Sequence, residues 1–300
     1  MIKYITAKTA SIKWNISERS VRNYCALGRV ENAFLDKGVW MIPIDAKKPK
    51  RSNEKMNKNY LLERLREEKK NSIKGGIYHL IQIDLTYNSN HIEGSELTHD
   101  QTRYIFETRT IDLKNDENES IKVDDVIETI NHFTAIDRVI DFANYELSEP
   151  FIKELHKILK SGTEDSRLAW FAVGDYKKRA NIVGGRETTP PKLVAQSMKS
   201  LLDEYNQKEK HSFEEIVEFH VKFERIHPFQ DGNGRVGRLI AFKECLKNNI
   251  VPFIIFDNYK QYYYRGLKEW NHQKGYLVDT CLYGQDILKQ KLDYFGIQYQ

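Results

Sequence analysis

The stretch "IHPFQDGNGRVGR", Ile226 to Arg238, holds the densest group of chemically useful residues in this 300-residue chain. The preceding "SFEEIVEFHVKFERI" carries apolar residues at helical spacing, and the proline at 228 disfavours a helical residue before it. A second helical pattern begins near Arg235. The residues between these helices therefore form a tight connection that ends at a helix N-terminus.

That helix N-terminus predicts an anion site. Its free backbone N–H groups and positive dipole attract phosphate, and Gly232 and Gly234 leave room for a close approach. Arg235 and Arg238 lie three residues apart on one side of the first turn, where each can fork onto phosphate oxygens.

Two further side chains of the loop predict chemistry. Asp231 is the carboxylate nearest to a divalent cation on such a phosphate, and His227 has a side chain suited to proton abstraction at neutral pH. Together the loop indicates nucleotide-dependent transfer to a hydroxyl group. The alternative is a corner between two helices whose arginines make surface ion pairs.

Composition limits the classes of protein. No apolar run approaches the length of a membrane-spanning helix, and "MIKYITAKTA" lacks the apolar stretch of a secretory signal. The three cysteines form neither a zinc pattern nor a disulfide framework, which favours a reducing, cytoplasmic location. Residues 1–75 hold 18 Lys/Arg against 8 Asp/Glu, so a basic module precedes a more acidic body.

The first fifty residues predict a separate domain. Two short helical patterns, with Ser17 placed to cap the second, are followed by "AFLDKGVWMIP", which predicts two strands. The stretch resembles the small winged helix-turn-helix domains of the excisionase and MerR type. That resemblance implies DNA binding by the outer face of the second helix, at Arg19, Ser20, Arg22 and Asn23. The alternative is a domain that docks only onto protein.

The remaining chain is predicted to be mainly α. Helical patterns occur near 59–73, 77–92, 121–143, 149–160, 190–206, 213–226, 235–249, 259–272 and 279–295. Only "YKKRANIVGGRETTPP" alternates as a β-hairpin would. We expect a winged helix-turn-helix domain at 1–50, a linker and connecting helix at 51–76, and a helical catalytic domain with one hairpin at 77–300.

"HPFQDGNGRVGR" fits the Fic-family pattern His-Pro-Phe-x-Asp/Glu-Gly-Asn-Gly-Arg-x-x-Arg without a departure, and the resemblance extends over roughly residues 77–290. It implies an all-helical protein adenylyltransferase that moves AMP from ATP to a Ser, Thr or Tyr hydroxyl. His227 would be the general base, and Asp231 would hold Mg²⁺ between the α- and β-phosphates. The implied nucleotide cradle is Gly232, Asn233, Gly234, Arg235, Val236, Gly237 and Arg238, with the two arginines on the outer phosphates. The phosphorylating Doc type lacks the intact Gly-Asn-Gly-Arg run.

Two other stretches resemble further Fic features. "NIVGGRETTPP" stands where the family has a flap, along which a target protein segment would bind through backbone hydrogen bonds. Its tip, Val183, Gly184, Gly185 and Arg186, would lie near the nucleotide. "YKQYYYRGLKEWN" resembles the segment bordering adenine and ribose, with Tyr263, Tyr264 and Asn271 as the matching positions. Tyrosines on a helix also serve as core or rim residues.

An upstream motif implies regulation. Ser89 and Glu93 in "TYNSNHIEGSELT" match the family's inhibitory pattern Ser/Thr-x-x-x-Glu-Gly/Asn, whose glutamate pairs with the second arginine of the loop, here Arg238. A carboxylate there would take the guanidinium fork from the γ-phosphate. Alternatively, Glu93 is only a helix-terminal residue before Gly94.

The sequence therefore predicts an autoinhibited adenylyltransferase that modifies a target protein and itself. A related hypothesis is removal of AMP from a modified target, with Glu93 positioning water. A third is a DNA-binding regulator whose Fic body senses nucleotide. The oligomeric state, a homo-oligomer included, stays open. The histidine–glutamate pair at 220 and 224 has helical spacing for a metal, but no third ligand is near, which favours a packed histidine.

Overall fold

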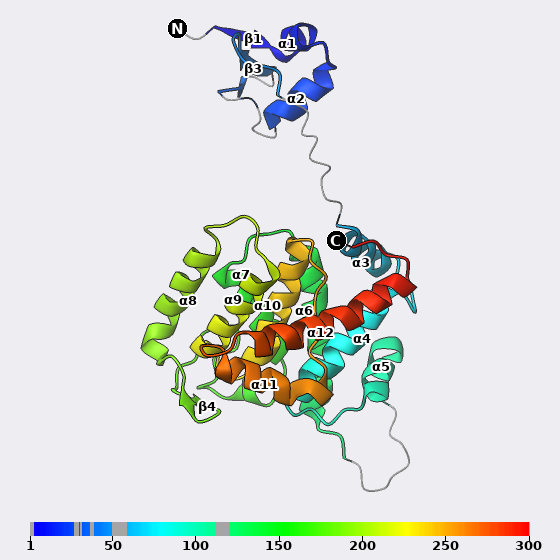
Figure 1. Ribbon diagram of the computed structural model, residues 1–300, viewed down its shortest axis with the longest axis vertical. Helices are drawn as coiled ribbons and strands as arrows, with labels where there is room; N and C mark the ends of the chain where they lie inside the picture. Colours follow the sequence, from blue (N-terminus) through cyan, green and yellow to red (C-terminus); the bar gives the residue numbers. More distant parts are fainter. Residues whose placement is uncertain are drawn as a thin grey trace. The chain divides into compact units, whose positions relative to one another are not determined.

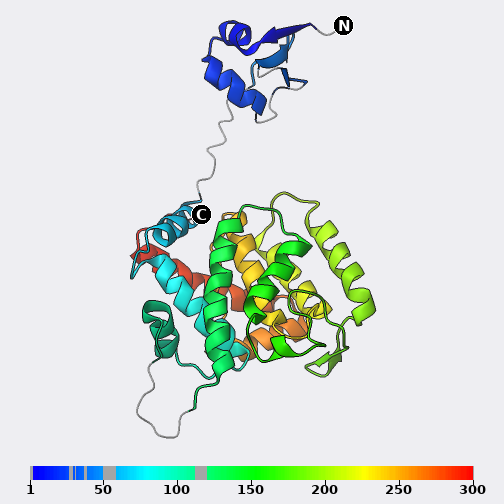
Figure 2. The same ribbon diagram turned by 180° about the vertical axis from the view of Figure 1, so that it is seen from behind.

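A computed structural model describes residues 3–26, 30, 32–36, 39–49, 59–111 and 120–299 of the chain. The chain divides into two compact units, Met1–Asn57 and Lys58–Gln300, drawn in Figures 1 and 2. The division falls in the lysine-rich stretch that the sequence marks as a linker. Each unit is described by itself.

The first unit contains β1 (Tyr4–Thr6), α1 (Ala7–Trp14), α2 (Glu18–Ala26), β2 (Phe34–Asp36) and β3 (Val39–Pro43). The strands form an antiparallel sheet in the order β1-β3-β2. The hydroxyl of Ser17 accepts a hydrogen bond from the backbone N–H of Ser20 at 3.2 Å, as expected of a helix cap. The sequence predicts the two helices and the hairpin in this order, but not β1. Assignment to the winged helix-turn-helix class stays a prediction, and Gly28, Lys37 and Gly38 lie outside the described residues.

The second unit is mainly α. Its helices are α3 (Tyr60–Lys70), α4 (Ile77–Ile92), α5 (His99–Thr108), α6 (Val123–Phe142), α7 (Glu149–Lys160), α8 (Pro191–Tyr205), α9 (Phe213–Ile226), α10 (Asn233–Lys247), α11 (Lys260–Glu269) and α12 (Gly275–Tyr294). Two 3₁₀ helices, η1 (Asp165–Arg167) and η2 (Asp257–Tyr259), and the hairpin β4 (Ile182–Val183) and β5 (Arg186–Glu187) complete it.

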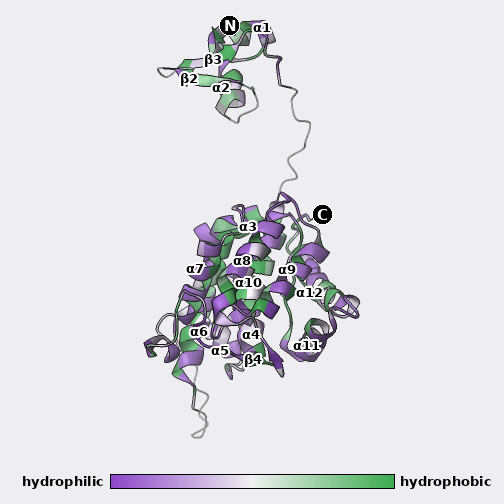
Figure 3. Ribbon diagram, turned by 90° about the vertical axis from the view of Figure 1, so that its left-hand side faces the viewer, coloured by the Kyte–Doolittle hydropathy of each residue, from purple (hydrophilic) through white to green (hydrophobic). Residues whose placement is uncertain are grey.

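Helix α10 runs through the middle of this unit, with α4, α6, α7 and α9 packed against it (Figures 1 and 2). Every residue of α10 except Gly234 and Lys247 is buried, which explains why its sequence lacks a clear polar face. The other helices alternate hydrophobic and hydrophilic residues along their length (Figure 3). Their apolar faces form a large core that includes Phe223, Phe229 and Leu239, together with two smaller clusters. The helix that carries the motif is therefore held from several sides.

The structure departs from the sequence-based expectation at four helices. Helix α5 is additional, α10 begins at Asn233, two residues before its predicted start, and α12 begins at Gly275, four residues before its predicted start. Helix α3, expected to connect the domains, packs against α4 and α6 and buries Leu61, Leu62 and Leu65. It therefore belongs to the second unit, because its apolar face has no other surface to cover.

Candidate active site

The loop between α9 and α10 is shaped by two residues with left-handed backbone. His227, the C-cap of α9, has φ 51° and ψ 62°, and Gly232, the N-cap of α10, has φ 77°. Only glycine adopts this conformation freely, so the motif needs Gly232, and His227 is held there by its surroundings. The turn stops α9 at Ile226, as the proline at 228 predicts, and aims the loop at the N-terminus of α10.

Asn233 locks the loop from inside. Its amide oxygen accepts a hydrogen bond from the backbone N–H of Phe229 at 2.8 Å, and its amide nitrogen donates to the carbonyl of Phe229 at 2.9 Å. The ring of Phe229 is fully buried and stacks on His156 with 4.0 Å between centroids. The sequence assigns Asn233 to the phosphate cradle, but its side chain bonds to the loop, so only its backbone N–H is left to bind an anion.

His227 carries an uncharged imidazole ring at neutral pH. Burial, and secondly the nearby ammonium of Lys177, lower the pKa of His227 to about 4. Its Nδ1 atom is buried and has no hydrogen-bond partner among the described residues. At neutral pH the ring is therefore uncharged, which is the state that a general base requires.

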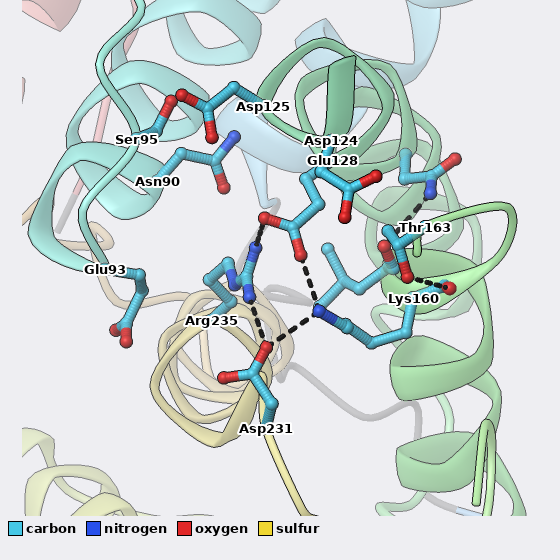
Figure 4. A network of polar contacts seen from close by, with 12 residues as sticks. Asn90, Glu93, Ser95, Asp124, Asp125, Glu128, Lys160, Thr163, Asp231 and Arg235 are labelled. Carbon is cyan, nitrogen blue, oxygen red and sulfur yellow. Dashed lines mark hydrogen bonds and ion pairs between the residues drawn. The ribbon is translucent and has the colours of Figure 1, made fainter. Parts of the chain in front are cut away.

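Asp231 belongs to a ring of four charges (Figure 4). Its Oδ2 atom accepts from Lys160 Nζ at 2.8 Å and from Arg235 Nη2 at 3.1 Å. Glu128 closes the ring, since its Oε1 lies 2.7 Å from Lys160 Nζ and its Oε2 pairs with Arg235. Burial would raise the pKa of Asp231, but Arg235 and Lys160 outweigh it and lower that pKa to about 2.

This ring changes the expectation for Arg235. The sequence predicts that Arg235 binds the outer phosphates, whereas its guanidinium is buried and divided between Glu128 and Asp231. Arg235 therefore holds Asp231 and Glu128 in place, and its guanidinium has no free pair of N–H groups for an anion.

Asp231 fits a role as a divalent-cation ligand. Its side chain is 47% exposed and ionised, and the oxygen that bonds neither Lys160 nor Arg235 points away from them (Figure 4). Within the described ranges, no three His, Cys, Asp or Glu side chains group to hold a metal. A magnesium ion here would draw its other ligands from phosphate and water, as is usual for this ion.

Arg238 is held by the end of α4. Its Nε donates to the hydroxyl of Ser89 at 2.9 Å, and its Nη2 donates to the Ser89 carbonyl at 2.9 Å and to Glu93 Oε1 at 2.6 Å. A side chain at Gly234 would clash with that same Glu93 oxygen. The carboxylate of Glu93 thus lies against the first turn of α10, beside the predicted anion cradle.

The other two cradle positions face inward. Val236 is fully buried, and its N–H donates to the carbonyl of Gly232 at 3.0 Å within the helix. Gly237 faces α9, because an added side chain would lie 2.9 Å from the ring of His220. The backbone donors free for an anion are therefore those of the first turn, before Val236.

The flap stands exposed at the edge of this unit. Val183 and its neighbours from Gly184 to Arg186 are all exposed, and Arg186 reaches the carbonyl of Lys268 on α11 at 3.3 Å. At the base, the buried ammonium of Lys177 donates to Asn181 at 2.9 Å and to Thr188 at 2.6 Å.

The three positions expected to border adenine and ribose differ in placement. Tyr263 is buried, with its hydroxyl 2.7 Å from His220 Nε2, so it is a core residue. Tyr264 is 46% exposed and donates to the carbonyl of Ile92, next to Glu93. Asn271 is exposed and accepts from Arg225 at 2.8 Å.

Sequence reasoning misses three residues of this site: Lys160, Glu128 and Lys177. Glu128 lies on α6, Lys160 on α7 and Lys177 before the flap, and none belongs to a short motif. The only available signal is a polar residue on the inner face of an amphipathic helix, as at Glu128 and Lys160. The pair His220–Glu224 is packed as expected: burial lowers the pKa of His220 to about 3 and raises that of Glu224 to about 8.

In the N-terminal unit, two of the predicted DNA-contacting side chains are described. Arg22 pairs with Glu18 at 2.6 Å, with both side chains exposed, and the hydroxyl of Ser20 lies 2.9 Å from that of Ser17. The side chains of Arg19 and Asn23 lie outside the described residues. No helix in the described part of the chain is long and apolar enough to cross a membrane.

The chain is similar to proteins of one known family. Residues 146–244 match the model of the Fic/DOC family. Proteins named protein adenylyltransferase Fic from Drosophila ananassae and Drosophila sechellia are 28% and 29% identical over 214 and 210 residues, which cover 68% of this chain. The chain spans 38% of the length of these curated relatives.

Solved structures resemble the fold. A Fic-domain-containing signalling protein from Bacteroides thetaiotaomicron has a TM-score of 0.60 at 24% identity, covering 77% of this chain and 94% of that one. Fic-1 from C. elegans has a TM-score of 0.58 at 20% identity, covering 79% and 72%.

Proposed function

We propose that this chain, whose residues 146–244 match the Fic/DOC family model, is an autoinhibited protein adenylyltransferase of that family. The observation that carries the proposal is the loop from His227 to Arg238, which combines a neutral, half-buried histidine, an ionised aspartate and a helix N-terminus without a side-chain cap. ATP is the proposed co-substrate, with a divalent cation at Asp231.

The proposed reaction uses His227 as the base. Its neutral ring takes the proton of a target hydroxyl, the hydroxyl oxygen forms a bond to the α-phosphorus of ATP, and the bond to the leaving pyrophosphate breaks. The first turn of α10 binds phosphate oxygens through backbone N–H groups. A magnesium ion, when bound, supplies charge neutralisation to the phosphates, and Asp231 is the residue that would hold it.

Glu93 is the proposed inhibitor. In this chain its carboxylate takes one nitrogen of Arg238 and adjoins Gly234, where a γ-phosphate would need the same guanidinium. The carboxylate of Glu93 and the γ-phosphate compete for the guanidinium of Arg238 and repel each other. ATP therefore binds in an unproductive position until Glu93 moves.

The flap is the proposed docking edge for the target. Ile182 and Val183 of β4 are 68% and 47% exposed and pair only with β5 among the described strands. An extended segment can add to such an edge through backbone hydrogen bonds, with little demand on its sequence.

Labelled ATP tests the proposal. The protein and its Glu93→Gly variant are incubated with α-labelled ATP, Mg²⁺ and a protein extract, and protein-bound label is measured. We expect strong labelling with Glu93→Gly, weak labelling with the wild-type chain, and none with Glu93→Gly/His227→Ala. Absence of covalent AMP on any protein in all three reactions would refute the function.

Removal of AMP from a modified protein is a second candidate, favoured by the place of Glu93 beside the cradle. There the carboxylate would take a proton from water, whose oxygen attacks the phosphorus and releases AMP from the target. Protein labelled by the Glu93→Gly variant is the substrate for this test. Label released by the wild-type chain but not by Glu93→Gln supports it, and label retained by both contradicts it.

For the N-terminal unit we infer DNA binding from its basic charge and its helix pair. The exposed Arg22–Glu18 pair is weak enough for a DNA phosphate to replace Glu18. Such binding, with the Fic body as a nucleotide sensor, predicts a salt-dependent affinity for a specific site that the Arg19→Glu/Arg22→Glu variant loses. Weak binding without sequence preference would count against it.

A further inference from the structure

We propose that Glu128 and Lys160 are positioning residues that set the cation affinity of Asp231 in opposite directions. The inference rests on the proposed function only in taking Asp231 as the cation ligand. It concerns two side chains on α6 and α7 that lie outside the motif (Figure 4).

The first step is the geometry of the ring. Lys160 Nζ lies 2.7 Å from Glu128 and 2.8 Å from Asp231, and a third carboxylate, that of Asp165, lies 3.2 Å away. The Lys160 side chain is only 3% exposed and that of Glu128 15%, so water weakens these contacts little. Arg235 is thus shared between two carboxylates and Lys160 among three.

The second step concerns the oxygen atoms of Asp231. Both cations bind Oδ2, which leaves one oxygen of a half-exposed carboxylate for a metal ion. The ring thereby fixes the side chain and limits it to a single metal–oxygen bond. Such a restriction sets where the phosphates bound to that ion lie relative to His227.

The third step is the sign of each effect. Without the charge of Glu128, Arg235 turns wholly to Asp231, Lys160 is shared only between Asp231 and Asp165, and the site gains one positive charge. Metal affinity must then fall. Without the charge of Lys160, Oδ2 keeps only its bond to Arg235 and the site loses one positive charge, so metal affinity must rise while the side chain is held less firmly.

Glu128→Gln and Lys160→Met keep the approximate size of each side chain and test these signs. Matched controls come from a second buried pair, Lys243 and Glu244, whose Nζ and Oε1 lie 2.7 Å apart on α10. Glu244→Gln and Lys243→Met perturb a buried ion pair to a similar degree without touching Asp231. Folding of every variant is checked by thermal unfolding, and Lys160→Gln replaces Lys160→Met if the latter does not fold.

The probe is Mn²⁺ alone, measured by electron paramagnetic resonance of the free ion with the full chain. We expect Glu128→Gln to raise the Mn²⁺ dissociation constant about tenfold and Lys160→Met to lower it severalfold. The controls should leave it unchanged, and Asp231→Asn should abolish the binding. Shifts in the same direction for both variants, no shift in either, or binding that survives Asp231→Asn would overturn the inference.

AMP transfer, measured separately in the Glu93→Gly background, distinguishes this inference from the proposed function. In that background the Lys160→Met variant should transfer AMP more slowly although it binds the metal ion more tightly. General damage to the fold would lower both the transfer rate and the metal affinity. Opposite Mn²⁺ shifts without any AMP transfer by Glu93→Gly would refute the proposed function and leave the positioning roles intact.

Discussion

The hydroxyl of Ser89 holds Arg238 without occupying the anion cradle, so its removal should weaken inhibition and leave the chemistry unchanged. In the structure the Ser89 hydroxyl accepts from Nε of Arg238 at 2.9 Å, and both side chains are buried. Ser89→Ala removes this acceptor but keeps the carbonyl of residue 89 and the carboxylate of Glu93.

The magnitude follows from that single bond. A buried hydrogen bond to a charged group contributes about 1.5–3 kcal/mol to the free energy of the state that contains it. Because Arg238 keeps two acceptors on α4, we expect the lower value, about 1.5 kcal/mol. That change raises the fraction of molecules with Arg238 free for nucleotide about tenfold.

The assay is the initial rate of AMP incorporation at a fixed ATP concentration. Ser89→Ala should be about tenfold faster than the wild-type chain and slower than Glu93→Gly. Ser95→Ala, on the same segment but without contact to Arg238, is the matched control. A Ser89→Ala rate within twofold of wild type, with Glu93→Gly activated, would refute the assignment of Ser89 to the clamp.

Three further predictions concern stability and the flap. Asn233→Ala leaves the buried N–H and carbonyl of Phe229 unpaired and should lower the free energy of unfolding by about 2–4 kcal/mol, measured in urea; a loss under about 1 kcal/mol would contradict the locking role. The pKa values of His156, His220 and His227 are lowered to about 3, 3 and 4, below the ordinary value of about 6.5. The unfolded chain therefore takes up protons first as pH falls, and each histidine should cost up to about 1.4 kcal/mol of stability per pH unit below about 6.5; a melting temperature equal at pH 7 and pH 5 would disagree. Lys177→Met should speed amide hydrogen exchange over residues 181–188, because the flap base loses its donor to Asn181 and Thr188, whereas exposed Lys192→Met should not.

The parts of the site that the sequence predicts are those encoded locally. The end of α9 at His227, the glycine turn and the anion-binding start of α10 follow from a dozen consecutive residues, because proline and glycine act on their immediate neighbours. The Glu93–Arg238 contact joins residues 145 positions apart. It came from the family resemblance, since no local rule pairs these two side chains.

The parts that the sequence misses are decided by packing. Three consecutive tyrosines follow the first two residues of α11, and only Tyr263 is buried, because it alone contacts His220. Arginine is a residue type that binds phosphate, but the guanidinium of Arg235 forms an ion pair with Glu128 of α6. The start of helix α5 does have a signal in the sequence, because Thr98 and Gln101 form a capping box there. The apolar pattern that follows is short, and for that reason the helix was not predicted.

The central claim is that a competent transfer site is held off by Glu93. Intact mass spectrometry of the purified wild-type chain, Glu93→Gly and Glu93→Gly/His227→Ala after incubation with each of the four NTPs and Mg²⁺ tests it most directly. The account predicts the added mass of one or more AMP groups on Glu93→Gly with ATP, little on the wild-type chain, and none on the double variant. Equal modification of the wild-type chain and Glu93→Gly, or modification that survives His227→Ala, would contradict it.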